Sequence, residues 1–118
     1  LTYSGQSGVQ LTTGASIAYG ALGNLASVDN AASSANGGFA LLHVPTNTVG
    51  GGVTTIKVQH SADDSIWVDL ITFTTVAAAT ATSELKAVAS TVNRYLRATA
   101  STAGSSGAIT FMCSFARF

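Results

Sequence analysis

A polar segment near the middle of the chain carries side chains that could bind a cation. His60, Asp63 and Asp64 lie within five residues of one another, and Ser61 and Ser65 flank the two acids. Carboxylate oxygens are the usual ligands of hard cations such as Ca²⁺, but a calcium loop places more of them in a fixed pattern. Asp and Ser also stabilise turns by hydrogen bonding to their own backbone. We therefore interpret this segment as a turn and keep cation binding as the alternative.

Trp67 follows this turn and could stack against a sugar ring, as aromatic side chains do on carbohydrate-binding β-sandwiches. The chain has one Trp and three Tyr, too few for a row of aromatic side chains. Trp67 is flanked by the apolar residues Ile66 and Val68. We therefore predict a core position for Trp67, with a sugar-binding platform as the alternative.

Two arginines suggest an anion site further along the chain. Arg94 and Arg97 surround Tyr95. In a strand, side chains three positions apart point to opposite faces, so the two arginines would not act as one clamp. We expect them to form salt bridges with Asp69 or Glu84, or to contact a neighbouring subunit.

Catalytic chemistry has little support in the sequence. His43 and His60 lie in apparent strands, and no serine lies in a nucleophile-elbow motif. The single cysteine, Cys113, points to the core by its position in an alternating pattern, where a thiol is inert. The glycines at 50–52 lack the lysine and helix of a phosphate-binding loop. We predict no enzyme activity, no catalytic residues, no cofactor-binding or metal-binding residues, and no cofactor.

Short apolar runs separated by glycine clusters indicate the fold class. There are 12 glycines and 1 proline in 118 residues, and Thr, Val and Ile are frequent in the runs. This pattern predicts an all-β antiparallel sandwich, jelly-roll or Ig-like, of about seven to nine strands. The expected strands are Val9–Thr13, Ser16–Tyr19, Leu25–Asp29, Phe39–Val44, Val53–His60, Trp67–Phe73, Ser83–Ala89, Arg94–Thr99 and Ile109–Ala116.

The residues also bear on where one of these strands ends and on whether another is a strand or a helix. We expect Pro45 to end the strand that begins at Phe39, because proline cannot donate to a strand ladder. The segment Ala77–Ala89 is rich in alanine and could instead form a short helix. We prefer a strand there, because Thr80 and Thr82 interrupt the alanines.

The last strand alternates most regularly. Ile109, Phe111, Cys113 and Phe115 share one face, which must be core. The other face carries no charge, which predicts either a central strand or a face covered by a partner.

Charge is scarce along the whole chain. Only 8% of the residues are Asp, Glu, Lys or Arg, against a typical ~25%. The formal net charge is +0, which argues against a nucleic-acid partner. No segment reaches the ~18 apolar residues that a membrane helix needs. A protein with so few charges tends to self-associate. We therefore favour assembly with other chains, with a hydroxyl-rich surface that keeps a monomer in solution as the alternative.

The length predicts one domain in two parts. Residues 1–28 are low in complexity and would form an N-terminal arm or the first strands, and residues 29–118 would form the β-sandwich domain. Residues 1–56 contain a single charged residue, Asp29.

Several stretches of the chain resemble a module found in structural proteins of tailed bacteriophages. They are DNAASSANGG at 29–38, LHV at 42–44, KVQHSADDSIWVDLITF at 57–73, VNRYLR at 92–97 and FAR at 115–117. The resemblance implies a β-sandwich carried by tail (tail-tube type) proteins, with no catalytic residues. Members are often longer, with a tube-forming domain ahead of the module, and residues 1–28 are too few for such a domain.

The resemblance leads to a functional expectation. The chain would be a structural protein of a phage virion, assembled in the host bacterial cytoplasm, as a subunit or decoration module of the tail tube. Its partners would be copies of itself and other phage structural proteins, without nucleic acid or membrane. The alternatives are a capsid decoration (cement) protein and a surface module that binds host glycans.

Overall fold

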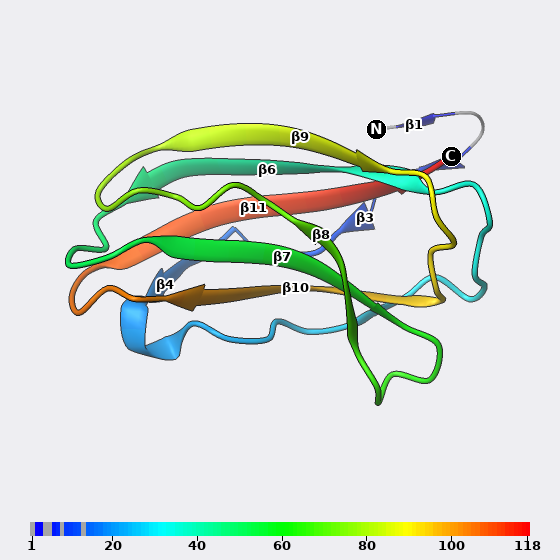
Figure 1. Ribbon diagram of the computed structural model, residues 1–118, viewed down its shortest axis with the longest axis horizontal. Helices are drawn as coiled ribbons and strands as arrows, with labels where there is room; N and C mark the ends of the chain where they lie inside the picture. The colour runs from blue at the N-terminus through cyan, green and yellow to red at the C-terminus, as the bar shows by residue number, and fades with distance from the viewer. Residues whose placement is uncertain (1, 4–5, 8, 13) are drawn as a thin grey trace.

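The chain folds into two antiparallel β-sheets that pack face to face (Figure 1). The computed structural model describes residues 2–3, 6–7, 9–12 and 14–118. The all-β sandwich predicted from the glycine-punctuated apolar runs is confirmed. One short 3-10 turn, Tyr19–Ala21, interrupts the strands. Among the described residues, no helix is long and apolar enough to cross a membrane.

The four-stranded sheet has the order β5-β10-β7-β8. Its strands are β5 (Val28–Asp29), β10 (Tyr95–Thr102), β7 (Thr54–Ser61) and β8 (Val68–Thr72). β7 and β8 form an antiparallel hairpin: they pair with one register shift and are joined by the polar turn at 61–65. Thr54, Ile56 and Val58 of β7 share one face and are buried.

The five-stranded sheet has the order β3-β11-β6-β9, with β4 also paired to β11. Its strands are β3 (Val9–Gln10), β11 (Ala108–Arg117), β6 (Gly38–Asn47), β9 (Thr82–Val88) and β4 (Ser16–Ala18). A separate small hairpin is formed by β1 (Thr2–Tyr3) and β2 (Gln6–Ser7). The uncharged outer side of β11 predicted either a central strand or a face covered by a partner, and β11 is a central strand.

The core lies between the two sheets and receives alternate side chains from both. On β11, Ile109, Phe111, Cys113 and Phe115 are each at most 1% exposed, so the face assignment is confirmed. On the opposite side of β11, Ala116 is the exception, because it is 1% exposed although its neighbours in that series are not buried. Large side chains of the other sheet complete the core: Ile56, Val58, Ile71, Phe73 and Leu96.

The prediction that Pro45 ends its strand is wrong. β6 runs through Pro45 to Asn47, and its last two residues pair with Ile109 and Thr110 of β11. The register between β6 and β11 shifts between Thr110 and Met112, opposite Pro45. A bulge of this kind leaves one residue out of the ladder, so a proline without an N–H is tolerated there.

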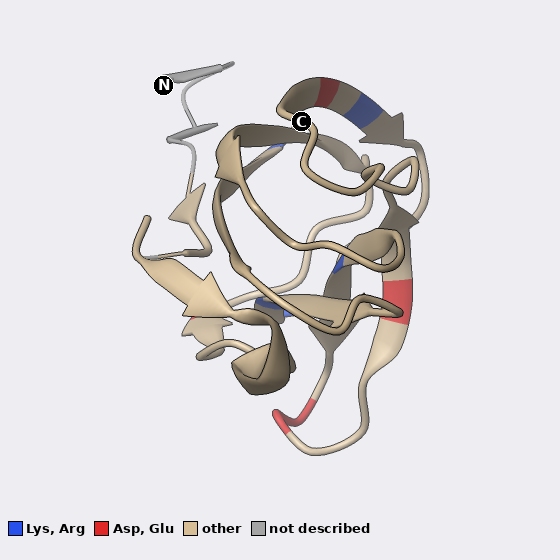
Figure 2. Cartoon of the chain, turned by 90° about the vertical axis from the view of Figure 1, so that its left-hand side faces the viewer, with Lys and Arg blue, Asp and Glu red and all other residues tan. Residues whose placement is uncertain are grey.

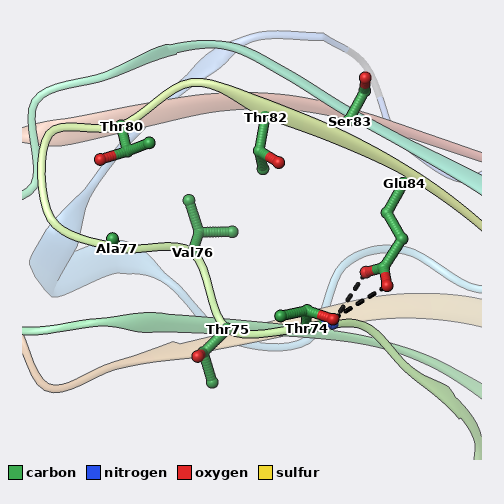
Figure 3. Close-up of a pocket in the computed structure, with 8 residues that line it drawn as sticks. All are labelled: Thr74, Thr75, Val76, Ala77, Thr80, Thr82, Ser83 and Glu84. Carbon is green, nitrogen blue, oxygen red and sulfur yellow. Dashed lines mark hydrogen bonds between the residues drawn. The ribbon is translucent and has the colours of Figure 1, made fainter.

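The alternative of a helix at 77–89 is excluded, because β9 spans Thr82–Val88 as an edge strand paired with β6. Two of its side chains cross to the other sheet. Lys86 Nζ donates to the carbonyl of Thr72 at 2.8 Å, and the Glu84 carboxylate accepts from Thr74 N and Thr74 Oγ1 at 2.8 and 2.9 Å (Figure 3). These bonds close the open side of the sandwich.

The N-terminal strands are shorter than expected. β3 holds two residues of the expected Val9–Thr13, and Thr13 lies outside the described residues. Of the expected Leu25–Asp29, only Val28–Asp29 forms a strand, although Leu25 N donates to the carbonyl of Ala98 at 2.9 Å. Leu11 is 4% exposed and belongs to the core.

Candidate functional site

The outer side of the four-stranded sheet carries a connected polar network. Asp69 on β8 accepts from Lys57 Nζ at 2.9 Å and from Gln59 Nε2 at 2.9 Å, both on β7. Gln59 Oε1 in turn accepts from Arg97 Nε on β10 at 2.9 Å. These hydrogen bonds lower the pKa of Asp69 below its usual value, the one from Gln59 most strongly. We call this side the charged face, defined by Lys57, Gln59, Asp69 and Arg97 with the neighbouring Asp29, Arg94, Tyr95 and Trp67.

Trp67 belongs to this face and not to the core, so the predicted core position is wrong. The guanidinium carbon of Arg97 lies 4.2 Å from the centre of the Trp67 ring, which is a cation–π stack. Trp67 is half-buried, whereas its neighbours Ile66 and Val68 are 72% and 55% exposed. The apolar flanks suggested a core strand, but β8 begins only at Val68, after a turn that carries Ile66 and Trp67 past the edge of the core.

The salt bridges expected between the two arginines and Asp69 or Glu84 are also wrong. Arg94 pairs with Asp29, with Nε–Oδ1 at 2.7 Å and Nη2–Oδ2 at 2.9 Å. Its guanidinium carbon also lies 5.1 Å from the centre of the Tyr95 ring. The Arg94 hydrogen bond lowers the pKa of Asp29 to about 2, with help from the backbone N–H of Ala31. Arg97 bonds Gln59 and reaches Asp69 only through it.

Arg117 is a buried arginine that the sequence reasoning missed. Its side chain is 9% exposed and makes five hydrogen bonds. Nε and Nη2 donate to Asn30 Oδ1, Nη1 donates to Ser34 Oγ and the Val92 carbonyl, and Nη2 also donates to the Asn93 carbonyl at 2.7 Å. The guanidinium therefore ties the end of β11 to the loops at 30–34 and 92–93. Burial lowers its pKa.

The polar segment after β7 forms a turn, as predicted. Asp63 Oδ1 accepts from Ser61 Oγ at 2.9 Å and from the backbone N–H groups of Ser65 and Ile66 at 3.0 Å. These bonds lower the pKa of Asp63. Asp64 has a φ of 59°, the left-handed region that Asp tolerates in turns. Asp63 is thus engaged by its own turn, and among the described residues no three His, Cys, Asp or Glu side chains gather as metal ligands.

Cys113 and the two histidines lie in different environments. Cys113 is buried on β11, and burial raises the pKa of its thiol to about 12, so its predicted core position is confirmed. His60 Nδ1 accepts from the backbone N–H of Asn93 at 3.0 Å. His43 is exposed on β6. Burial lowers the pKa of His60, and the nearby Arg117 guanidinium lowers it further.

The outer side of the five-stranded sheet differs sharply from the charged face. The outward-pointing residues that the structure describes on β6, β9 and β11 include no Asp, Glu, Lys or Arg. Figure 2 shows how few acidic and basic residues the ribbon carries as a whole. Three large apolar side chains are exposed there: Leu85 at 64%, Leu41 at 42% and Met112 at 37%.

The register shows how these side chains are arranged. Leu85, Leu41 and Ser114 form one cross-strand row, and Ser83, His43 and Met112 form the next. We call this side the uncharged face, defined by the two rows together with Phe39 and Ala87. The outward residues of β11 were expected to carry no charge. In the structure, the outward residues of β6 and β9 carry none either.

A shallow hollow of about 360 Å³ lies between β9 and the segment at 74–80 (Figure 3). Five hydroxyl side chains and one carboxylate line it: Thr74, Thr75, Thr80, Thr82, Ser83 and Glu84. Both oxygens of the Glu84 carboxylate already accept hydrogen bonds from Thr74. The hollow therefore lies beside the contact between Glu84 and Thr74 that links the two sheets at this edge.

Comparisons with protein-family models, with curated proteins and with solved structures gave no match to this chain. The resemblance to phage structural modules thus stays a prediction. Its quoted stretches nevertheless meet in space. Asp29 contacts Arg94, and Asn30 contacts Arg117, so three of the stretches are joined by side-chain hydrogen bonds. The residues that carry the resemblance hold strands and loops together.

Proposed function

We propose that this chain is a non-enzymatic structural protein of a tailed-bacteriophage virion, a subunit or decoration module of the tail tube. The observation that carries the proposal is the uncharged face, with Leu41, Leu85 and Met112 exposed on one side of the sandwich. Large exposed apolar patches usually mark surfaces that contact other proteins. The resemblance of residues 29–117 to phage modules supplies the identity of the assembly.

The contacts on the charged face also support the proposal, because they argue against glycan binding at that face. There the polar side chains bond one another, and the aromatic ring of Trp67 is covered on one side by Arg97. A sugar would need that ring surface free in order to stack on it. The glycan-binding alternative therefore has less support than assembly, and the capsid decoration alternative relies on the same uncharged face.

The test compares matched lysine substitutions on the two faces. Met112→Lys adds a charge to the uncharged face, and Ser101→Lys adds the same charge to an exposed position on the outer side of β10. We expect the unaltered protein to form oligomers in sedimentation velocity and to be present in purified particles by mass spectrometry. Met112→Lys should reduce assembly, because the contact would have to bury an unpaired charge, and Ser101→Lys should not.

A strictly monomeric protein that is also missing from purified particles would end this proposal. Equal loss of assembly in both lysine variants would show that the uncharged face is not the contact. Circular dichroism and thermal unfolding of each variant establish that the fold is retained.

A further inference from the structure

The free edge of β9 is an unguarded strand edge. β9 spans seven residues, pairs with β6 along one side without a register shift, and contains no proline. Proteins usually protect such edges with charged side chains, proline or bulges, because the unpaired backbone groups can pair with another chain. β9 is the last strand in the order of its sheet. In Figure 1 it runs along the upper side of the sandwich, whereas the turn between β7 and β8 projects from the lower side.

The charged side chains of β9 protect a different edge. Lys86 binds the carbonyl of Thr72, and Glu84 binds the backbone N–H of Thr74, so both turn toward the β8 side of the other sheet. The side chains that point outward from β9 are Ser83, Leu85 and Ala87, all exposed and all uncharged. The bonds of Lys86 and Glu84 cover the end of β8 at Thr72, and the edge of β9 is left open.

The sequence of β9 is complementary to itself in the antiparallel direction. Leu85 is the middle residue of Thr82–Val88. A twofold axis through Leu85 would place Leu85 opposite its own copy, Ser83 opposite Ala87, and Glu84 opposite Lys86. Each acid would thus lie opposite a base across the junction, twice, on the inward side where Glu84 and Lys86 also contact Thr74 and Thr72. Opposite charges facing one another across a strand pair are stabilising.

We propose that β9 pairs antiparallel with β9 of a second copy of this chain, about a twofold axis at Leu85. The proposal rests on the proposed function, since it names the surface through which two subunits meet. The two five-stranded sheets would join into one continuous sheet, and their uncharged faces would form a single surface twice as wide. Such an interface is isologous, with the same patch on both copies.

Cysteine cross-linking tests the register. Opposed residues in antiparallel strands have Cα atoms about 4.5–5.5 Å apart, within the range of a disulfide. Leu85→Cys should therefore give a dimer on a non-reducing gel after mild oxidation, whereas Ser83→Cys and Ala87→Cys should not, because neither residue faces its own copy. The double variant carrying both Ser83→Cys and Ala87→Cys should cross-link. The native Cys113 is buried and serves as the background in every sample.

Charge variants at Leu85 provide a second arm. Leu85→Lys and Leu85→Glu each place like charges on the axis and should weaken dimerisation roughly tenfold or more. A one-to-one mixture of the two should restore dimers. Met112→Lys, on a central strand of the same face, should keep the Leu85→Cys cross-link even where larger assemblies are lost.

The outcomes separate the two proposals. Cross-linking of Leu85→Cys alone among the single variants, with recovery in the Lys and Glu mixture, supports the β9 pairing. An oligomeric protein in which Leu85→Cys does not cross-link, or cross-links no better than Ser83→Cys, overturns the pairing and leaves assembly in place. A protein that stays monomeric and is missing from particles overturns both.

Discussion

Both outer faces of this sandwich are formed by alternate residues of their strands. They differ in whether the outward side chains have partners within the molecule. On the charged face, Lys57, Asp69, Gln59 and Arg97 form one connected chain of hydrogen bonds. On the uncharged face, Leu85 is 64% exposed beside Leu41 and Met112. The polar side chains of the charged face thus have partners within one molecule, and the exposed apolar residues near it, Ile66 and Val68, lie at and just after the turn between β7 and β8. The uncharged face instead leaves apolar side chains in water on the sheet surface itself, which a partner could cover.

This difference teaches where function should be sought in a β-sandwich of this kind. Conspicuous residues such as Trp67 and Arg97 attract attention, but they contact each other. The informative surface is made of residues that are unremarkable by type and become informative through their position. An exposed leucine is ordinary by itself, and a charge-free sheet face with several of them is not.

The largest expected effect concerns the core that both faces share. Phe111→Ala should lower the free energy of unfolding by about 3–5 kcal/mol, because the ring is buried and a cavity would remain. Its neighbour Met112→Ala, which points outward, should change it by less than about 1 kcal/mol. Urea unfolding of both variants measures this. Similar losses for the two would contradict the face assignment on which the comparison depends.

Arg117→Met is expected to have the next largest effect, a loss of about 2–4 kcal/mol. The substitution removes five hydrogen bonds, among them the one to the Asn93 carbonyl, and leaves the buried Val92 carbonyl with the bond from Ser34 N alone. Arg94→Met is the matched control, because Arg94 is exposed and its ion pair with Asp29 faces solvent. Thermal unfolding should separate the two variants clearly. An equal effect would mean that burial does not distinguish these arginines.

The fold was more predictable than the placement of polar side chains. Period-2 alternation placed Ile109, Phe111, Cys113 and Phe115 in the core, and the same alternation continued two residues further also turns Arg117 inward. That signal was available but unused, because an arginine is rarely buried without a carboxylate. Its neutral partners come from two distant loops, and no local pattern brings those loops together.

Other predictions were wrong for reasons that depend on tertiary contacts. Whether Pro45 ends or continues β6 depends on the register shift against β11. Whether Trp67 is core or surface depends on where β8 begins relative to the turn. The partner of Arg94 is Asp29, which lies 65 residues away in the chain. Strand pairing decides all three, and pairing is the part that local alternation leaves open.

A pH titration should distinguish the two sides of the sandwich. The pKa of His60 is lowered in the folded state, so the folded protein binds fewer protons than the unfolded chain as pH falls below the ordinary value of 6.5. Stability should therefore be highest above this pH and decrease as pH falls through it, as protonation would also break the bond from Asn93 N. Urea unfolding at several pH values measures the slope.

His60→Gln should reduce this slope, and His43→Gln, at an exposed position on the uncharged face, should retain it. A slope that is unchanged in His60→Gln would show that another group causes the pH dependence. If only His60→Gln reduces the slope, the pH dependence of stability arises at His60 on β7. If it does not, the pH dependence arises elsewhere.

The smallest expected effect is that of salt, which should act on the two faces in different ways. Raising NaCl from about 0.05 M to about 1 M shortens the Debye length to a few ångströms and screens the exposed pairs of the charged face. The melting temperature should fall by at most a few degrees, since exposed pairs contribute little. Contacts through the uncharged face involve apolar side chains, and sulfate should strengthen them. Sedimentation in each salt measures assembly. If assembly dissolved in NaCl while the Leu85→Cys cross-link through β9 persisted, the charged face would be the interface, and the roles assigned to the two faces would have to be exchanged.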